Sequence, residues 1–283
     1  MISQAKKVLH INLPKHTYEI KSYPDLSHFI GGVGLGLKLL SLYREELPLI
    51  FAVGPLNGFF PFASKTSVLM EDNGAIEDLY LGGSLSHRIR YAGLDAIVLL
   101  GKSRVPTILE IQDDEVKFHS LDTDLGLLGL PGKKSVLNFT QKGFYLDEYF
   151  EAPGKFLEKR LLQKNIKAIC VTGTKSHKLK NPAKYEALYK RLLSDVTKLT
   201  VAASSNPSCS GCPVGCALSK TGEIGGNLLV HSLVGCAFAE KIYSDVGTVF
   251  SCLNVLGYTY THEDIENLPE IIYSVLEELT AHA

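Results

Sequence analysis

Three cysteines crowded into eight residues constrain this chain more than any other feature of its sequence. They form the segment Cys209-Ser210-Gly211-Cys212-Pro213-Val214-Gly215-Cys216. Thiolates at spacings of three and four residues reach three corners of one cubane iron–sulfur cluster, and the two glycines let the backbone curl around it. The segment is therefore predicted to be a metal-binding loop, and a [4Fe-4S] cluster is the predicted occupant.

Two other interpretations of the motif stay open. A zinc knuckle usually pairs two Cys-x-x-Cys units or adds histidines at set spacing, and no such second unit follows here. A metal-free cluster of structural thiols is the other alternative. Three disulfides are disfavoured, because three of the six cysteines are crowded together while Cys170, Cys236 and Cys252 lie singly in apolar segments.

A cubane cluster needs a fourth ligand, and we take Cys236 for it. Cys252 and a residue of a partner chain are the alternatives. Both Cys236 and Cys252 lie within apolar segments of helical periodicity, where a buried thiol that only fills core space is equally expected. Cys170 lies in a buried strand and is assigned to the core.

Composition and charge exclude several classes of partner. The chain has 283 residues, 45% of them hydrophobic, with a net charge of -1, so nothing favours nucleic acid or anionic lipid as a partner. No stretch approaches the roughly 20 apolar residues of a membrane span. The first residues lack the apolar run of a signal peptide. We therefore expect a cytoplasmic protein that binds no nucleic acid and no membrane.

The hydrophobic pattern predicts an α+β fold with two parts. Up to about Val171 the chain is strand-rich with short helices: a hairpin over 7–21, a helix over 26–43, strands over 49–53, 67–70, 96–100, 107–112, 116–120 and 167–171, and helices over 84–91 and 153–164. Helical periodicity then follows over 182–199, 231–242, 245–256 and 262–279, the last with a break at Pro269. We predict a strand-rich domain over 1–175 and a smaller all-α segment over 176–283 that contains the cysteine motif.

Several stretches, in order, resemble the N-terminal domain of the aldehyde:ferredoxin oxidoreductase family. Phe29–Gly36 is similar to the family's Gly-Gly-Arg-Gly-Leu-Gly turn, and Ala52–Gly58 to its Gly-Pro-Leu-Thr-Gly segment. Leu81–Lys102 resembles the long Ser-Gly-Gly…Ala-Gly-Tyr-Asp-Ala-Ile-Val…Gly-Lys block. Lys164–Ile169 resembles Lys-Asn-Leu-Lys-Ala-Ile, and Leu253–Thr261 a helix end with Leu-Gly-Leu-Asp-Thr. The resemblance covers nearly the whole chain.

The resemblance implies a fold and a chemistry. In this family the first domain packs two sheets into a base for a bis-pterin tungsten or molybdenum cofactor. A cubane cluster beside the pterin passes electrons to ferredoxin, and an aldehyde is oxidised to a carboxylic acid. Pterin phosphates would need Gly-rich turns and helix N-termini, so the resemblance implies cofactor contacts at Gly31, Gly32, Gly34, Lys65, Gly82 and Gly83. Close helix–sheet packing is the alternative explanation for these glycines.

The sequence also departs from the family pattern. Val33 and Lys65 stand where the family has arginines, and lysine keeps the charge but loses bidentate phosphate recognition. Lys155–Lys159 replaces an Arg-Gly-Gly-Val-Gly turn, and Gly225–Leu229 replaces Gly-Pro-Glu-Tyr-Glu, which removes a carboxylate near the metal. The later helical domains of the family have no counterpart in this sequence.

These features lead to one main hypothesis and two alternatives. The main hypothesis is a redox protein that carries a [4Fe-4S] cluster and works with a partner chain. The partner would be ferredoxin or another redox subunit. A homo- or hetero-oligomer would cover the surface that the missing helical domains cover in the family. We do not expect aldehyde oxidation by the isolated chain. The first alternative is a non-catalytic paralogue that serves as a structural or assembly subunit without pterin. The second is a small enzyme with an unrelated ligand in the glycine-lined cleft.

Overall fold

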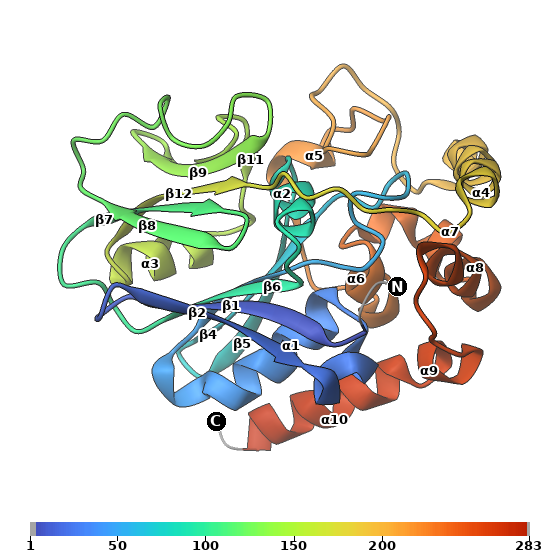
Figure 1. Ribbon diagram of the computed structural model, residues 1–283, viewed down its shortest axis with the longest axis horizontal. Coiled ribbons are helices and arrows are strands. Elements are labelled where there is room, and N and C mark those ends of the chain that lie inside the picture. The colour runs from blue at the N-terminus through green and yellow to red at the C-terminus, as the bar shows by residue number, and fades with distance from the viewer. Residues whose placement is uncertain (1–3, 282–283) are drawn as a thin grey trace.

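Two β-sheets form the centre of the molecule in the computed structural model, which describes residues 4–281 (Figure 1). Sheet A has the order β13-β5-β4-β3-β6-β1-β2. Its strands are β1 (Lys6–Asn12), β2 (Thr17–Tyr23), β3 (Leu49–Ala52), β4 (Thr66–Asp72), β5 (Ala75–Leu81), β6 (Ala96–Leu100) and β13 (Glu223–Ile224). Neighbouring strands pair antiparallel except β1 and β6, which run parallel.

Sheet B is smaller and has the order β11-β10-β9-β12-β7-β8. Its strands are β7 (Thr107–Gln112), β8 (Glu115–His119), β9 (Lys134–Thr140), β10 (Gly143–Leu146), β11 (Phe150–Glu151) and β12 (Ile166–Thr172). Its single parallel pair is β12 with β7.

Helices cover sheet A on the side away from sheet B, as the α1 and α10 ribbons of Figure 1 show. The α-helices are α1 (Gly32–Tyr43), α2 (Leu85–Tyr91), α3 (Phe156–Gln163), α4 (Pro182–Ser194), α5 (Leu218–Thr221), α6 (Leu228–Leu233), α7 (Glu240–Tyr243), α8 (Val246–Leu256), α9 (His262–Glu266) and α10 (Leu268–Ala281). The short 3₁₀ helices are η1 (Pro24–Phe29), η2 (Arg44–Glu46), η3 (Asp195–Lys198) and η4 (Ala237–Ala239).

Strand β1 shows how the sequence builds two cores on the two faces of sheet A. Successive side chains of a strand point to opposite faces. Val8 accordingly packs into the core with the helices, while Leu9 and Ile11 pack into the core between the two sheets. All three side chains are fully buried. Sheet A is therefore apolar on both faces and forms the middle layer of the molecule.

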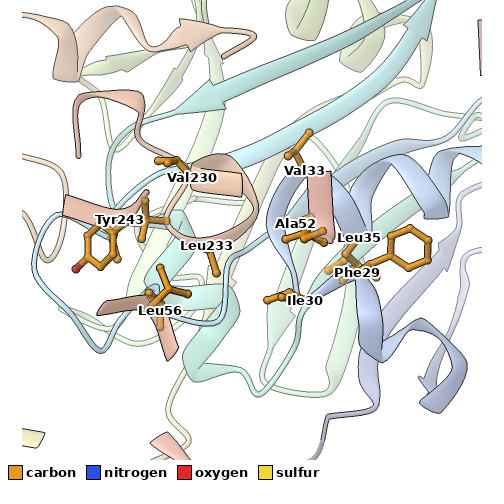
Figure 2. Close-up of a cluster of buried hydrophobic side chains, with 14 of the residues drawn as sticks. Phe29, Ile30, Val33, Leu35, Ala52, Leu56, Val230, Leu233 and Tyr243 are labelled. Carbon is orange, nitrogen blue, oxygen red and sulfur yellow. The ribbon is translucent and has the colours of Figure 1, made fainter. Parts of the chain in front are cut away.

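The core on the helical side joins segments that are far apart in the sequence. Figure 2 shows Val33 and Leu35 of α1 in the same cluster as Val230 and Leu233 of α6. Helix α1 packs on β3 and β4 and also contacts α6 and α10. This core therefore includes residues on both sides of residue 175, and the division into two domains there stays a prediction.

The predicted α+β class is confirmed, with local corrections. The hairpin, the α1 region and the break between α9 and α10 agree with the predictions, although the break lies at Asn267 and not at Pro269. The strands over 75–81, 134–140, 143–146 and 150–151 were missed. The segment after 175 is not entirely helical, because β13 adds to the edge of sheet A.

The predicted helix over 231–242 is wrong, and this correction matters for the site. Helix α6 ends at Leu233, and the chain turns at Gly235, whose φ is +69°. Cys236 has extended backbone angles and precedes the short turn η4. A left-handed glycine stops a helix where apolar periodicity alone would continue it. Within the described residues 4–281, no helix has the length and apolar character needed to cross a membrane.

Candidate metal centre

The four cysteines predicted as metal ligands line one small cavity. Cys209, Cys212 and Cys216 come from the loop before α5, and Cys236 comes from the turn after α6. The other lining residues are mostly apolar: Phe62, Ser64, Lys65, Leu199, Val201, Val214 and Phe238. The other two cysteines do not line it, because Cys252 is buried in the core around α8 and Cys170 in a small cluster on sheet B.

Close backbone contacts bring the two cysteine-bearing segments together. Two backbone hydrogen bonds hold the cysteine loop against the segments around Phe62 and Gly83. Phe62 N–H donates to Gly211 O at 3.1 Å, and Ser210 N–H donates to Gly83 O at 3.0 Å. The turn that carries Cys236 is held against the segment around Ser64, because Ser64 N–H donates to Val234 O at 3.1 Å. A Cβ on Gly235 would lie 2.4 Å from Lys65 O, so only glycine permits this approach.

Lys65 places a buried positive charge at the cavity. Its side chain is 1% exposed, its Nζ lies 3.3 Å from Glu223 Oε2, and it sits 4.9 Å from the centre of the Phe238 ring. The ion pair lacks hydrogen-bond geometry, and no described group accepts a hydrogen bond from this Nζ. Burial alone would lower the pKa of Lys65, but Cys236 and Glu223 beside it hold that pKa above its ordinary value.

Glu223, which the sequence did not single out, connects the cavity to a buried aromatic pair. Its Oε1 accepts from Ala237 N–H at 2.9 Å and lies 3.3 Å from His231 Nε2. The His231 ring stacks on Tyr80 with centroids 3.6 Å apart, and the Tyr80 hydroxyl donates to Asp78 at 2.7 Å. Although burial opposes ionisation, His231 and Lys65 keep the pKa of Glu223 below its ordinary value.

Burial favours the protonated form of three of the thiols, those of Cys209, Cys212 and Cys236. Burial raises the pKa of all three of these thiols above the ordinary cysteine value. The pKa of Cys212 rises to about 11 and the pKa of Cys236 to about 12. Lys65 acts in the opposite direction on all three. Metal ligation needs thiolates, so loading this site would release protons.

The geometry also sets a limit on what fits. The cavity volume is about 20 Å³, room for about one water molecule. Within residues 4–281, no three His, Cys, Asp or Glu side chains are arranged to hold a single metal ion. The four sulfur donors and the unpartnered ammonium group have the chemistry of a thiolate-bound cluster, but a cavity of this volume is too small to hold one as it stands.

Protein atoms fill the space around the first group of glycines predicted to bind phosphate. A Cβ on Gly31 would lie 2.9 Å from Val53 O, one on Gly32 would lie 2.2 Å from His231 O, and one on Gly34 would lie 2.8 Å from a methyl carbon of Ile272. These three glycines therefore let α1 pack closely against its neighbours.

The second pair of glycines lies against the cysteine loop and β10. A Cβ on Gly82 would lie 3.0 Å from Cys209 Sγ, and one on Gly83 would lie 2.7 Å from a methyl carbon of Leu146. The start of α2 carries a carboxylate of the protein itself: Asp147 Oδ2 accepts from Ser84 N–H at 3.0 Å and from the Ser84 hydroxyl at 2.6 Å. These contacts give Gly82 and Gly83 a packing role, and phosphate binding at these positions stays a prediction.

Comparisons with known proteins agree with this architecture. Residues 8–136 match the family model described as "Aldehyde ferredoxin oxidoreductase, N-terminal domain". The chain is 30% identical over 147 residues to the aliphatic sulfonate oxidoreductase WOR-like subunit of Pyrococcus furiosus, covering 46% of this chain and 23% of that protein. It is 24% identical over 233 residues to the tungsten-containing aldehyde ferredoxin oxidoreductase of Pyrococcus abyssi, covering 71% of this chain and 38% of that one.

Residues 8–136 of this chain therefore resemble the N-terminal domain of the aldehyde ferredoxin oxidoreductase family. A solved structure supports the fold: the active site complex BamBC of benzoyl coenzyme A reductase superposes with a TM-score of 0.63 at 15% identity, over 99% of this chain and 64% of that one. The chain spans 23% and 38% of the length of the two curated proteins above.

Proposed function

We propose that this chain is an electron-transfer subunit that holds a [4Fe-4S] cluster on Cys209, Cys212, Cys216 and Cys236. The carrying observation is the meeting of these four cysteines, from two separate segments, at a cavity that also receives the buried ammonium group of Lys65. Such a cluster transfers single electrons. The chain's own contribution is to supply the thiols, exclude water with Phe62 and Phe238, and offset negative charge with Lys65.

A partner chain belongs to the same proposal. One similar protein is named a subunit, and the similar solved structure is named a complex. The chain spans less than two thirds of each, so an electron carried here has its donor and its acceptor elsewhere, on ferredoxin or another redox subunit. We place this exchange in the cytoplasm. We derive no step through a tungsten or molybdenum pterin, because the glycine turns and the start of α2 are already filled.

The same filled positions favour a second candidate function. A structural or assembly subunit would keep the sheet base of the family and its close packing while losing the cofactors. In that case Cys209, Cys212 and Cys236 would remain protonated, as burial favours. The two candidates differ in whether iron binds at the cysteine cavity.

Anaerobic preparation tests this difference. Protein purified without oxygen and incubated with ferrous iron and sulfide should turn brown and contain about four iron atoms per chain for a cubane. A Cys209→Ser, Cys212→Ser double variant treated identically should stay colourless. Zinc at about one atom per chain, or wild-type protein as free of iron as the double variant, would contradict the electron-transfer proposal, and the metal-free result would favour the structural subunit.

A further inference from the structure

A second cavity, remote from the cysteines, gathers positive charge without any carboxylate in its wall. It has a volume of about 420 Å³, within the range of small-molecule sites. Arg88 of α2, Lys133 before β9 and Lys175 after β12 all line it. Lys175 has an ion-pair partner, Asp114 at 3.4 Å, but Asp114 is not part of the wall. Three cations facing one space repel each other, and an anion among them would relieve that repulsion.

The positions of these cations are fixed by backbone contacts. Lys175 N–H donates to Tyr91 O at 2.7 Å, and a Cβ on Gly173 would lie 2.2 Å from Arg88 O, so the segment after β12 presses directly on α2. The Arg88 Nη2 donates to Gly132 O at 2.9 Å. Its Nε is buried and has no hydrogen-bond partner among the described residues. One face of this guanidinium group therefore has a donor to offer to a ligand.

Aromatic rings form the other side of the cavity. His177 lies edge-on to Phe59 with centroids 4.8 Å apart and lies 6.4 Å from the Tyr91 ring. The Tyr91 hydroxyl donates to Gly58 O at 2.7 Å, which fixes that ring. His177 Nε2 is buried and also has no partner within residues 4–281. A flat heterocycle would find ring surfaces and one hydrogen-bonding nitrogen here.

We propose that this cavity binds a nucleotide-class ligand, with its phosphate at Arg88, Lys133 and Lys175 and its base against the rings of Tyr91, Phe59 and His177. A nucleoside monophosphate is the simplest molecule that carries both an anion and a flat ring. The proposal does not depend on the iron–sulfur cluster, because the lining residues of the two cavities are different.

Calorimetric titration of the full chain with adenosine monophosphate, adenosine and inorganic phosphate tests it. We expect the monophosphate to bind about tenfold or more tightly than either part alone, because only it uses both walls. The variant Lys133→Ala should weaken the monophosphate at least several-fold and leave adenosine unchanged. Arg88→Ala should do the same with a larger effect, and Arg88→Lys should recover part of the loss.

The exposed neighbour Lys178, which does not line the cavity, provides the matched control, so Lys178→Ala should bind like the wild type. No binding of the monophosphate at millimolar concentration would overturn the proposal. So would inorganic phosphate binding as tightly as the monophosphate, or a monophosphate affinity that Lys133→Ala and Arg88→Ala leave unchanged.

Discussion

The glycine turns around α1 and the cysteine cavity belong to the same family architecture, but their packing differs. At Gly31, Gly32 and Gly34, protein atoms lie within 3 Å of where a Cβ would be. At the cysteine cavity, Lys65 Nζ and Glu223 Oε2 are buried without hydrogen-bond partners among the described residues. The first region is a finished packing interface, whereas the second holds thiols and an ion pair, Lys65 with Glu223, that lacks hydrogen-bond geometry.

The difference indicates where in this chain a ligand is needed to explain the packing. Buried polar groups without partners cost stability, so they persist where a ligand satisfies them or where a function requires them. Glycines that are already packed against backbone need no ligand to explain them. The comparison therefore separates the sheet base, which close packing explains, from the cysteine cavity, for which we propose a ligand.

The largest expected stability loss comes from the buried ion pair. Lys65→Met should lower the free energy of unfolding of the metal-free protein by about 3 kcal/mol, because it leaves the Glu223 carboxylate buried and short of charge compensation. Adding Glu223→Gln should recover part of this loss. Urea unfolding of the single and double variants measures both. A Lys65→Met protein as stable as the wild type would show that the ammonium group contributes nothing to this cavity.

The glycine interface is tested by two alanine substitutions at positions of similar backbone angle. Gly32 has φ +48° and backbone atoms of His231 and Ser232 where a Cβ would lie, whereas Gly225 has φ +63° and nothing within 4 Å. Gly225→Ala should cost about 1 kcal/mol from backbone strain alone. Gly32→Ala should cost at least about 2 kcal/mol more because of the contact. Equal losses in urea unfolding would mean that the interface tolerates a side chain.

Asp147 tests whether α2 depends on the protein's own carboxylate. Its two oxygens accept from Ser84, Ser135 and Val136, so Asp147→Asn should cost about 1 to 2 kcal/mol. Asp122→Asn, on an exposed loop, is the control and should change the free energy of unfolding by less than about 0.5 kcal/mol. If both variants unfold at the same urea concentration, the carboxylate does not stabilise α2.

A second buried lysine sharpens the comparison through pH. Burial lowers the pKa of Lys164 to about 7, and among the described residues its Nζ donates only to the carbonyls of Leu47 and Gly101. In contrast, Cys236 and Glu223 hold the pKa of Lys65 above its ordinary value. Between pH 7 and the ordinary lysine pKa near 10, the unfolded chain binds a proton at Lys164 that the folded protein does not. The free energy of unfolding should therefore rise with pH in that window.

The variant Lys164→Met removes this contribution. The stability difference between wild type and variant should grow in favour of the wild type by about 2 kcal/mol from pH 7 to pH 9. Urea unfolding at the two pH values measures it. A difference that stays constant would mean that Lys164 keeps its proton in the folded protein.

Local patterns predicted the fold class and the cysteine loop, because hairpins, apolar periodicity and the Cys-x-x-Cys-x-x-x-Cys spacing are local signals. The break at Gly235 was missed because apolar periodicity continues across it, although a Val-Gly-Cys sequence within a helix pattern was a warning. The contacts of Gly34 with Ile272 and of Lys65 with Glu223 were beyond reach, since they join residues more than 150 positions apart. No sequence signal marked Asp147 as the carboxylate at the start of α2.

The most direct test of the account compares two single cysteine variants after anaerobic loading with iron and sulfide. Cys236 lines the cavity, whereas Cys252 is a fully buried thiol in α8 and does not. We predict that Cys252→Ser binds iron like the wild type, at about four atoms per chain. We predict that Cys236→Ser loses at least about a quarter of that iron, as conversion to a three-iron cluster would require. Equal iron in Cys236→Ser and wild-type protein, with loss in Cys252→Ser, would contradict the central claim.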